Sequence, residues 1–196
     1  MIKTLQLSDN RLIQFSRFVE ETQTLYAGGV EGVFRYKLLY TGATDKKHTH
    51  KLDPLGSRLE IRLKLKSRLD GVSQWVKGMQ YDTELDVLFA WSLSHTSIYQ
   101  LSTGLHYFTF ENLLGTQEDL ITDVLYMPKY RYIVICSKQA KLQVYKWAAI
   151  SSLVTEFKGM DRPIKGLARH PNRVNQFVTA GLDLTIRIWC LEKFTC

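Results

Sequence analysis

Residues 176–190 constrain the fold more than any other stretch of the chain. A short apolar segment is followed by a tight turn at Asp183 and then by a segment in which apolar and polar side chains alternate up to a tryptophan. Alternation with a period of two places Ile186 and Ile188 on one face of an extended strand and Arg187 on the other face. The stretch is therefore predicted to form two strands joined by an Asp turn.

This arrangement of strand, Asp turn and strand ending in Trp resembles one repeat of the WD40 family, in which each repeat forms a blade of a β-propeller. In strong repeats of that family, a Ser or Thr, an Asp and a Trp form hydrogen bonds with a His near the start of the repeat. The resemblance assigns the first three of these structural positions to Thr179, Asp183 and Trp189. Met160 stands where the His would be, after Gly159, and a cysteine replaces the Asp that usually follows the Trp.

The spacing of aromatic residues supports a repeat. Tyr99, Tyr145 and Trp189 lie 46 and 44 residues apart, and repeats of this family are about 40–45 residues long. In the first unit, Glu31 and Lys37 match the Asp and Trp positions best, so the signature is eroded there. The interval from Lys37 to Tyr99 is 62 residues because it includes a polar, turn-rich loop.

The expected fold is all-β: a partial, open WD40-type β-propeller of about four blades, each with four antiparallel strands. The expected division is residues 1–10 as the leading strand of a neighbouring blade, 11–69 as the first blade with an exposed loop at 41–57, 70–115 as the second, 116–158 as the third, and 159–196 as the fourth with an incomplete outer strand. Such a chain looks like a fragment or shortened form of a larger WD-repeat protein, with an apolar face exposed on its first and last blades. The alternative is a closed four-bladed ring in which residues 2–7 complete the last blade.

Residues 59–66 form the cleanest alternating segment, with aliphatic side chains on one face and charged side chains on the other. We expect the outermost strand of the first blade here. The basic residues of this strand and of the loop before it are the candidate partner-binding residues: Lys46, Lys47, Lys51, Arg58, Arg62, Lys64, Lys66 and Arg68. They would attract an acidic partner. The competing interpretation is a solvated edge strand, whose charges prevent pairing with other sheets.

No pattern in the sequence indicates catalysis or a cofactor. His48 and His50 form a His-x-His pair without further ligands at metal-site spacing, apart from Asp45 and Asp53 in the same loop. The glycine-rich residues 28–32 lack both phosphate-binding spacings, and no Gly-x-Ser-x-Gly motif frames a nucleophile. We therefore expect no catalytic, cofactor-binding or metal site.

Composition narrows the cellular setting and the partners. The net charge of +7 permits an acidic partner, and the three cysteines, an odd number without metal-site spacing, favour a reducing compartment. Cys136 lies in an apolar run and is predicted to be a small buried hydrophobe. No apolar stretch is long enough to span a membrane, and the first residues are too polar for a signal peptide. An intracellular, cytoplasmic protein is expected.

The resemblance implies a non-catalytic scaffold that mediates protein–protein interactions within a larger assembly. The alternative is a binder of acidic or nucleic-acid partners through the basic strand. Aromatic and basic residues interleave between residues 126 and 147, which could serve to stack nucleic-acid bases. Half-buried strands explain the same pattern, so protein partners are expected and nucleic acid is not.

Overall fold

A computed structural model describes residues 11–41, 60–71, 75–111, 119–146 and 152–196 of the chain. These residues form fifteen strands in four antiparallel sheets, together with one short 3-10 turn, Pro128–Tyr130. The fold is all-β, as predicted.

The strands pair in the order in which they follow one another along the chain, so each sheet is a meander. The first sheet contains β1 (Ile13–Val19), β2 (Thr24–Gly29), β3 (Gly32–Thr41) and β4 (Glu60–Leu69). The second contains β5 (Gly78–Asp82), β6 (Val87–Trp91), β7 (His95–Gln100) and β8 (His106–Glu111). The third contains β9 (Ile121–Met127), β10 (Tyr132–Ser137), β11 (Leu142–Lys146) and β12 (Leu153–Phe157). The fourth contains β13 (Ile164–Arg169), β14 (Gln176–Gly181) and β15 (Ile186–Cys190).

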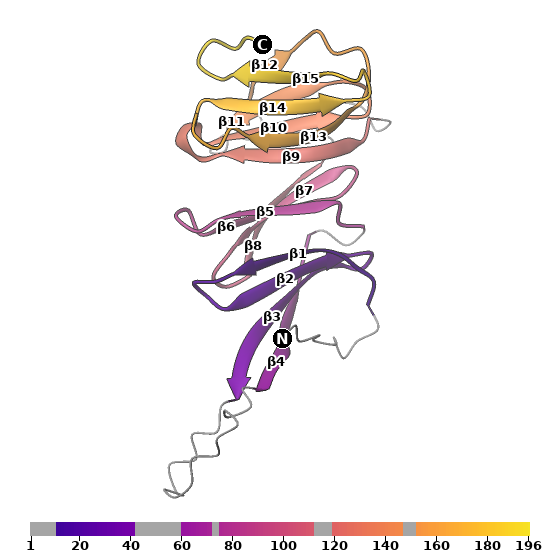
Figure 1. The fold of residues 1–196 in the computed structure, drawn as a ribbon. Helices are drawn as coiled ribbons and strands as arrows, with labels where there is room; N and C mark the ends of the chain where they lie inside the picture. The colour runs from indigo at the N-terminus through magenta and orange to yellow at the C-terminus, as the bar shows by residue number, and fades with distance from the viewer. Residues whose placement is uncertain (1–10, 42–59, 72–74, 112–118, 147–151) are drawn as a thin grey trace, which may run out of the picture.

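The four sheets follow one another in an open, propeller-like row (Figure 1). The first strand of each sheet lies beside the first strand of the next: β1 contacts β5, β5 contacts β9, and β9 contacts β13. A separate apolar core fills each of the three spaces between neighbouring sheets. Each inner sheet therefore buries apolar residues on both of its faces.

The two middle strands of every sheet pair in the same register. In each sheet, the second residue of the second strand pairs with an aromatic residue of the third strand. These pairs are Leu25–Tyr36, Leu88–Tyr99, Ile133–Tyr145 and Phe177–Trp189. This register corrects one prediction. Tyr36, which is 2 % exposed, occupies the position expected for Lys37. Burial selects an aromatic side chain there, and Lys37 lies on the opposite side of the strand.

The segment before β5 is tied to the first sheet. β5 begins only at Gly78, because the amides of Trp75 and Val76 bond to the carbonyls of Val30 and Gly29 in the first sheet. This segment approaches β2 closely, and a side chain at Gly28 would collide with Val76. In the second sheet the tight turn ends before His95, which already belongs to β7.

The incomplete outer strand predicted for the fourth sheet is reduced, among the described residues, to a single bridge. After β15, the chain turns, and only one bridge pairs Cys190 with Thr195. The sequence predicts a loop at 41–57, but Thr41 still belongs to β3; residues 42–57 lie outside the described residues, as do residues 2–7, predicted as a strand.

Candidate interaction surfaces

Trp189 lies at the centre of the core between the third and fourth sheets. Its side chain is 2 % exposed, and its ring centroid is 4.8 Å from that of Phe157. The indole Nε1 donates a hydrogen bond of 2.9 Å to Oγ1 of Thr179 on the neighbouring strand, which is also buried. The bond satisfies two polar atoms that would otherwise be costly to bury. Met160, at the predicted His position, packs against this core.

Asp183 organises the turn between β14 and β15. Its carboxylate accepts hydrogen bonds from the Thr185 amide (3.1 Å) and hydroxyl (2.8 Å), and from the guanidinium of Arg187. The bond from Arg187, followed by that from Thr185, lowers the pKa of Asp183. The partners found for Asp183 are thus in its own hairpin, whereas Thr179 and Trp189 bond to each other.

The face of the fourth sheet that is turned away from the third sheet is apolar and exposed. Ile186 is 75 % exposed and Ile188 53 %. Leu142 and Val144, at the same register positions of β11, are both 0 % exposed because the fourth sheet covers them. The sequence alternation predicted that Ile186 and Ile188 share a face, but alternation alone cannot tell whether anything covers that face.

The neighbouring strand β14 continues this surface. Its residues Val178 and Ala180 pair with Ile188 and Ile186, and they are half-buried and exposed, respectively. Their counterparts in β10, Val134 and Cys136, are 0 % exposed. We call the four residues Val178, Ala180, Ile186 and Ile188 the open face.

The strand β15 is also an edge of its sheet. In the first three sheets, the equivalent strands β3, β7 and β11 each pair with a fourth strand on this side. No described residue pairs with the outer edge of β15 before Cys190. An unpaired edge presents free backbone N–H and C=O groups, which are a template for another strand.

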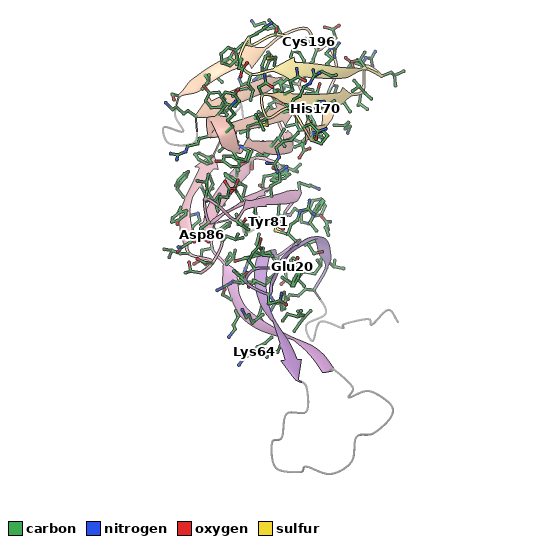
Figure 2. The ribbon with its side chains drawn as sticks, turned by 60° about the vertical axis from the view of Figure 1, so that its left-hand side comes forward. Glu20, Lys64, Tyr81, Asp86, His170 and Cys196 are labelled. Atoms are coloured by element: carbon green, nitrogen blue, oxygen red, sulfur yellow. The ribbon has the colours of Figure 1, made fainter. Side chains whose placement is uncertain are left out.

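The basic strand β4 lies near the other end of the row, where Figure 2 labels Lys64. Lys64, Lys66 and Arg68 are exposed, while Leu69 is buried in the first core. A register shift in the pairing of β4 with β3 interrupts the strict alternation, and Leu65 is 37 % exposed. Arg62 belongs to β4, but its side chain is not among those described, and Lys46, Lys47, Lys51 and Arg58 lie outside the described residues.

The described residues contain no cluster of His, Cys, Asp or Glu able to hold a metal ion. The His48–His50 pair is outside them. Cys136 is fully buried, as predicted, and burial raises the pKa of its thiol to about 12. None of the helical segments in the described part of the chain has the length and hydropathy needed to cross a bilayer.

In comparisons with known proteins, no protein-family model matches the sequence, and the search of curated proteins gives no match.

Proposed function

We propose that the chain is a non-catalytic interaction module of the WD40 type, which docks onto protein partners within a larger assembly. The observation that carries this proposal is the open face. Its four positions are occupied by apolar residues, as they are in the third sheet, but Ala180, Ile186 and Ile188 are exposed and Val178 is half-buried, whereas the counterparts in the third sheet are fully buried. Contiguous exposed apolar residues of this kind mark interaction sites.

The partner that fits this end of the row is another antiparallel β-sheet. Each internal core already joins two such sheets face to face, and the open face continues the same series. Full burial of Ile186 and Ile188 would contribute about 1.5–3 kcal/mol each. A strand of the partner pairing with β15 would add main-chain hydrogen bonds and fix the orientation.

A charge-insertion experiment tests the proposal. The double variant Ile186→Lys, Ile188→Lys places two charges on the open face, so affinity capture from cells should lose a defined set of proteins. Leu105→Lys is the matched control, since Leu105 is 62 % exposed and lies in the second sheet's β7–β8 turn. If both variants retain the same captured proteins as the wild type, the open face is not the docking site.

The basic strand β4 supports a second candidate function, the binding of an acidic or nucleic-acid partner. The specific observation in its favour is that Lys64, Lys66 and Arg68 are all exposed on one strand. Such binding would be electrostatic and therefore weakened by salt.

A further inference from the structure

A cavity of about 400 Å³ lies where the turn after β9 meets the turn after β13. It is far along the row from β4, as the labels of His170 and Lys64 show (Figure 2). Each of the two turns contributes a proline and at least one basic residue to its lining: Pro128 and Lys129 from one, Pro171 and Arg173 from the other. Arg169, the last residue of β13, completes the basic part.

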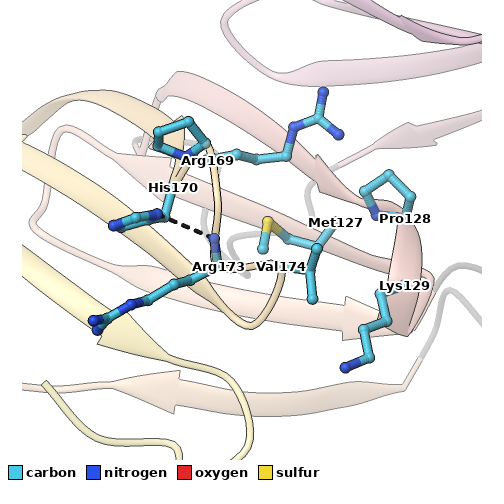
Figure 3. A pocket seen from close by; sticks show the side chains of 8 residues that line it. Met127, Pro128, Lys129, Arg169, His170, Arg173 and Val174 are labelled. Carbon is cyan, nitrogen blue, oxygen red and sulfur yellow. Dashed lines mark hydrogen bonds between the residues drawn. The ribbon is translucent and has the colours of Figure 1, made fainter.

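The cavity is strongly positive. Lys129, Arg169 and Arg173 are exposed, and none of the described lining residues is an Asp or Glu (Figure 3). Within the described part of the chain, none of the three cations forms an ion pair with a carboxylate; Arg173 has a 3.5 Å contact with the side-chain oxygen of Gln176. Glu192 does not line the cavity; its carboxylate accepts a hydrogen bond from the Tyr130 hydroxyl, which lowers the pKa of Glu192, and the charge of Lys129 adds a smaller effect in the same direction. The cations are therefore available to an anionic ligand.

The rest of the lining is apolar. Met127 is buried, Val174 is 57 % exposed, and both lie between the basic side chains (Figure 3). The prolines of the two turns add further apolar surface. A ligand that fills this cavity must therefore carry an apolar group as well as negative charge.

The turn after β13 is held in place by His170. Its Nδ1 accepts hydrogen bonds from the amides of Asn172 (3.2 Å) and Arg173 (3.1 Å). These bonds fix the backbone from which Arg173 extends, so part of the ordering needed for binding is already present.

We infer that this cavity binds an acidic segment of a protein partner, with carboxylates on Lys129, Arg169 and Arg173 and one aliphatic side chain on Met127 and Val174. The inference rests on the proposed function only in that the ligand is a protein, and it concerns a separate surface. A single small anion would leave most of the cavity unfilled and its apolar part uncovered. The described residues that line the cavity include no Phe, Tyr or Trp, and therefore none of the rings on which single-stranded nucleic acid stacks.

The test uses fluorescence anisotropy with a short labelled peptide in which a central leucine is flanked by glutamates. The variant Arg169→Glu, Arg173→Glu should weaken binding at least about tenfold, because opposing charges become like charges. The variant Lys64→Glu, Lys66→Glu makes the same change in net charge on β4, and it should alter the affinity by less than about twofold if binding is local. A peptide with glutamine in place of glutamate, and one with serine in place of leucine, should each bind more weakly.

The outcomes separate the possibilities. Equal losses in the two charge-reversal variants would overturn the inference, since they would indicate attraction by net charge alone. An oligonucleotide that binds more tightly than the peptide, and depends on Arg169 and Arg173, would assign the cavity to nucleic acid instead. If the Ile186→Lys, Ile188→Lys variant still binds the peptide, the cavity is a binding site independent of the open face, whether or not the open face docks partners. All substituted side chains are exposed, and the milder Arg169→Gln variant repeats the test if a thermal melt shows that the reversal destabilises the fold.

Discussion

The first and fourth sheets share one strand register but treat their outward faces differently. On the first sheet, the face turned away from the second sheet is largely covered: Phe34 is 1 % and Tyr36 2 % exposed, although Phe18 and Leu65 at its margin are 40 % and 37 % exposed. The guanidinium of Arg11 lies 4.0 Å from the centre of the Phe34 ring, and Ile13, Leu25 and Leu63 pack around it. On the fourth sheet, the corresponding end of the row is the open face.

Apolar side chains are exposed on the outward faces of both end sheets among the described residues, and the exposure is larger on the fourth sheet, where Ile186 is 75 % exposed. A head-to-tail row of identical chains needs an apolar face at both ends, since it joins unlike surfaces. The outward face of the first sheet buries Ala27, Phe34 and Tyr36 and so offers less apolar surface than the open face, which favours a different β-sheet as the partner of the open face.

The largest expected effect comes from removing the aromatic residue at the centre of the fourth sheet. Trp189→Ala should destabilise the protein by about 3–5 kcal/mol, since it leaves a cavity beside Phe157 and Phe177 and removes the partner of the Thr179 hydroxyl. Urea denaturation followed by circular dichroism measures this. An unchanged midpoint would contradict the assignment of Trp189 to the core.

In the first sheet, strand register assigns the position equivalent to Trp189 to Tyr36, whereas the sequence spacing assigns it to Lys37. Substitutions at the two residues distinguish these assignments. Tyr36→Ala should cost about 3 kcal/mol because the side chain is buried. Lys37→Ala should cost less than about 1 kcal/mol, although its ammonium group donates a hydrogen bond to the Thr22 carbonyl. The same denaturation experiment compares the two. A larger effect at Lys37 than at Tyr36 would show that the structural register of this sheet is wrong.

Much of the fold follows from local sequence. β6 begins and ends with its apolar run, and the alternation in residues 185–189 predicts β15 to within one residue. The start of β5 could not be predicted this way, because the Trp75 and Val76 amides bond to a turn more than forty residues earlier. The position of Tyr36 also depended on pairing, since Lys37 fits the repeat spacing about equally well.

The candidate surfaces could be predicted from the sequence less well than the strands. Lys64, Lys66 and Arg68 stand out because they are close together in the sequence. The cavity combines Lys129 with Arg169 and Arg173, which only the packing of β9 against β13 brings together. The exposure of Ile188 likewise depends on whether a further sheet is present, not on the strand pattern itself.

Substitution by threonine should cost more stability on the covered face of the third sheet than on the open face of the fourth sheet. Val144→Thr should destabilise by about 1–2 kcal/mol, because it buries a hydroxyl in the core between the third and fourth sheets. Ile188→Thr, at the same register position, should change stability by less than about 0.5 kcal/mol. Equal costs in the isolated chain would mean that the open face is covered in solution, which light scattering after size-exclusion chromatography would detect as association.

Charge reversal on the basic strand β4 should also have little effect on the stability of the fold. Arg62→Glu, Lys64→Glu is expected to lower stability by less than about 1 kcal/mol. Any binding of an acidic partner through β4 should disappear in this variant, and in the wild type it should weaken as salt is raised. Titrations with polyglutamate at two salt concentrations measure both. If binding is independent of salt concentration and unchanged in the charge-reversal variant, β4 is not the contact surface.

The smallest effect concerns the turn at Asp183, whose folded-state pKa lies below its ordinary value of 3.8 because Arg187 and Thr185 donate hydrogen bonds to the ionised carboxylate. A lowered pKa in the folded state means that folding favours the ionised form. The contribution of the ionised Asp183 to stability is therefore fully present above about pH 4 and is lost as the pH falls through the lower, folded-state pKa.

Asp183→Asn should accordingly lower the urea midpoint at pH 7 and narrow the difference between the midpoints at pH 7 and pH 3. Glu31→Gln, in the matching turn of the first sheet, should leave that difference closer to the wild-type value, because Glu31 is exposed and its contact with Arg11 is long, at 4.0 Å. If both variants shift the difference equally, the carboxylate of Asp183 has no special role in its turn.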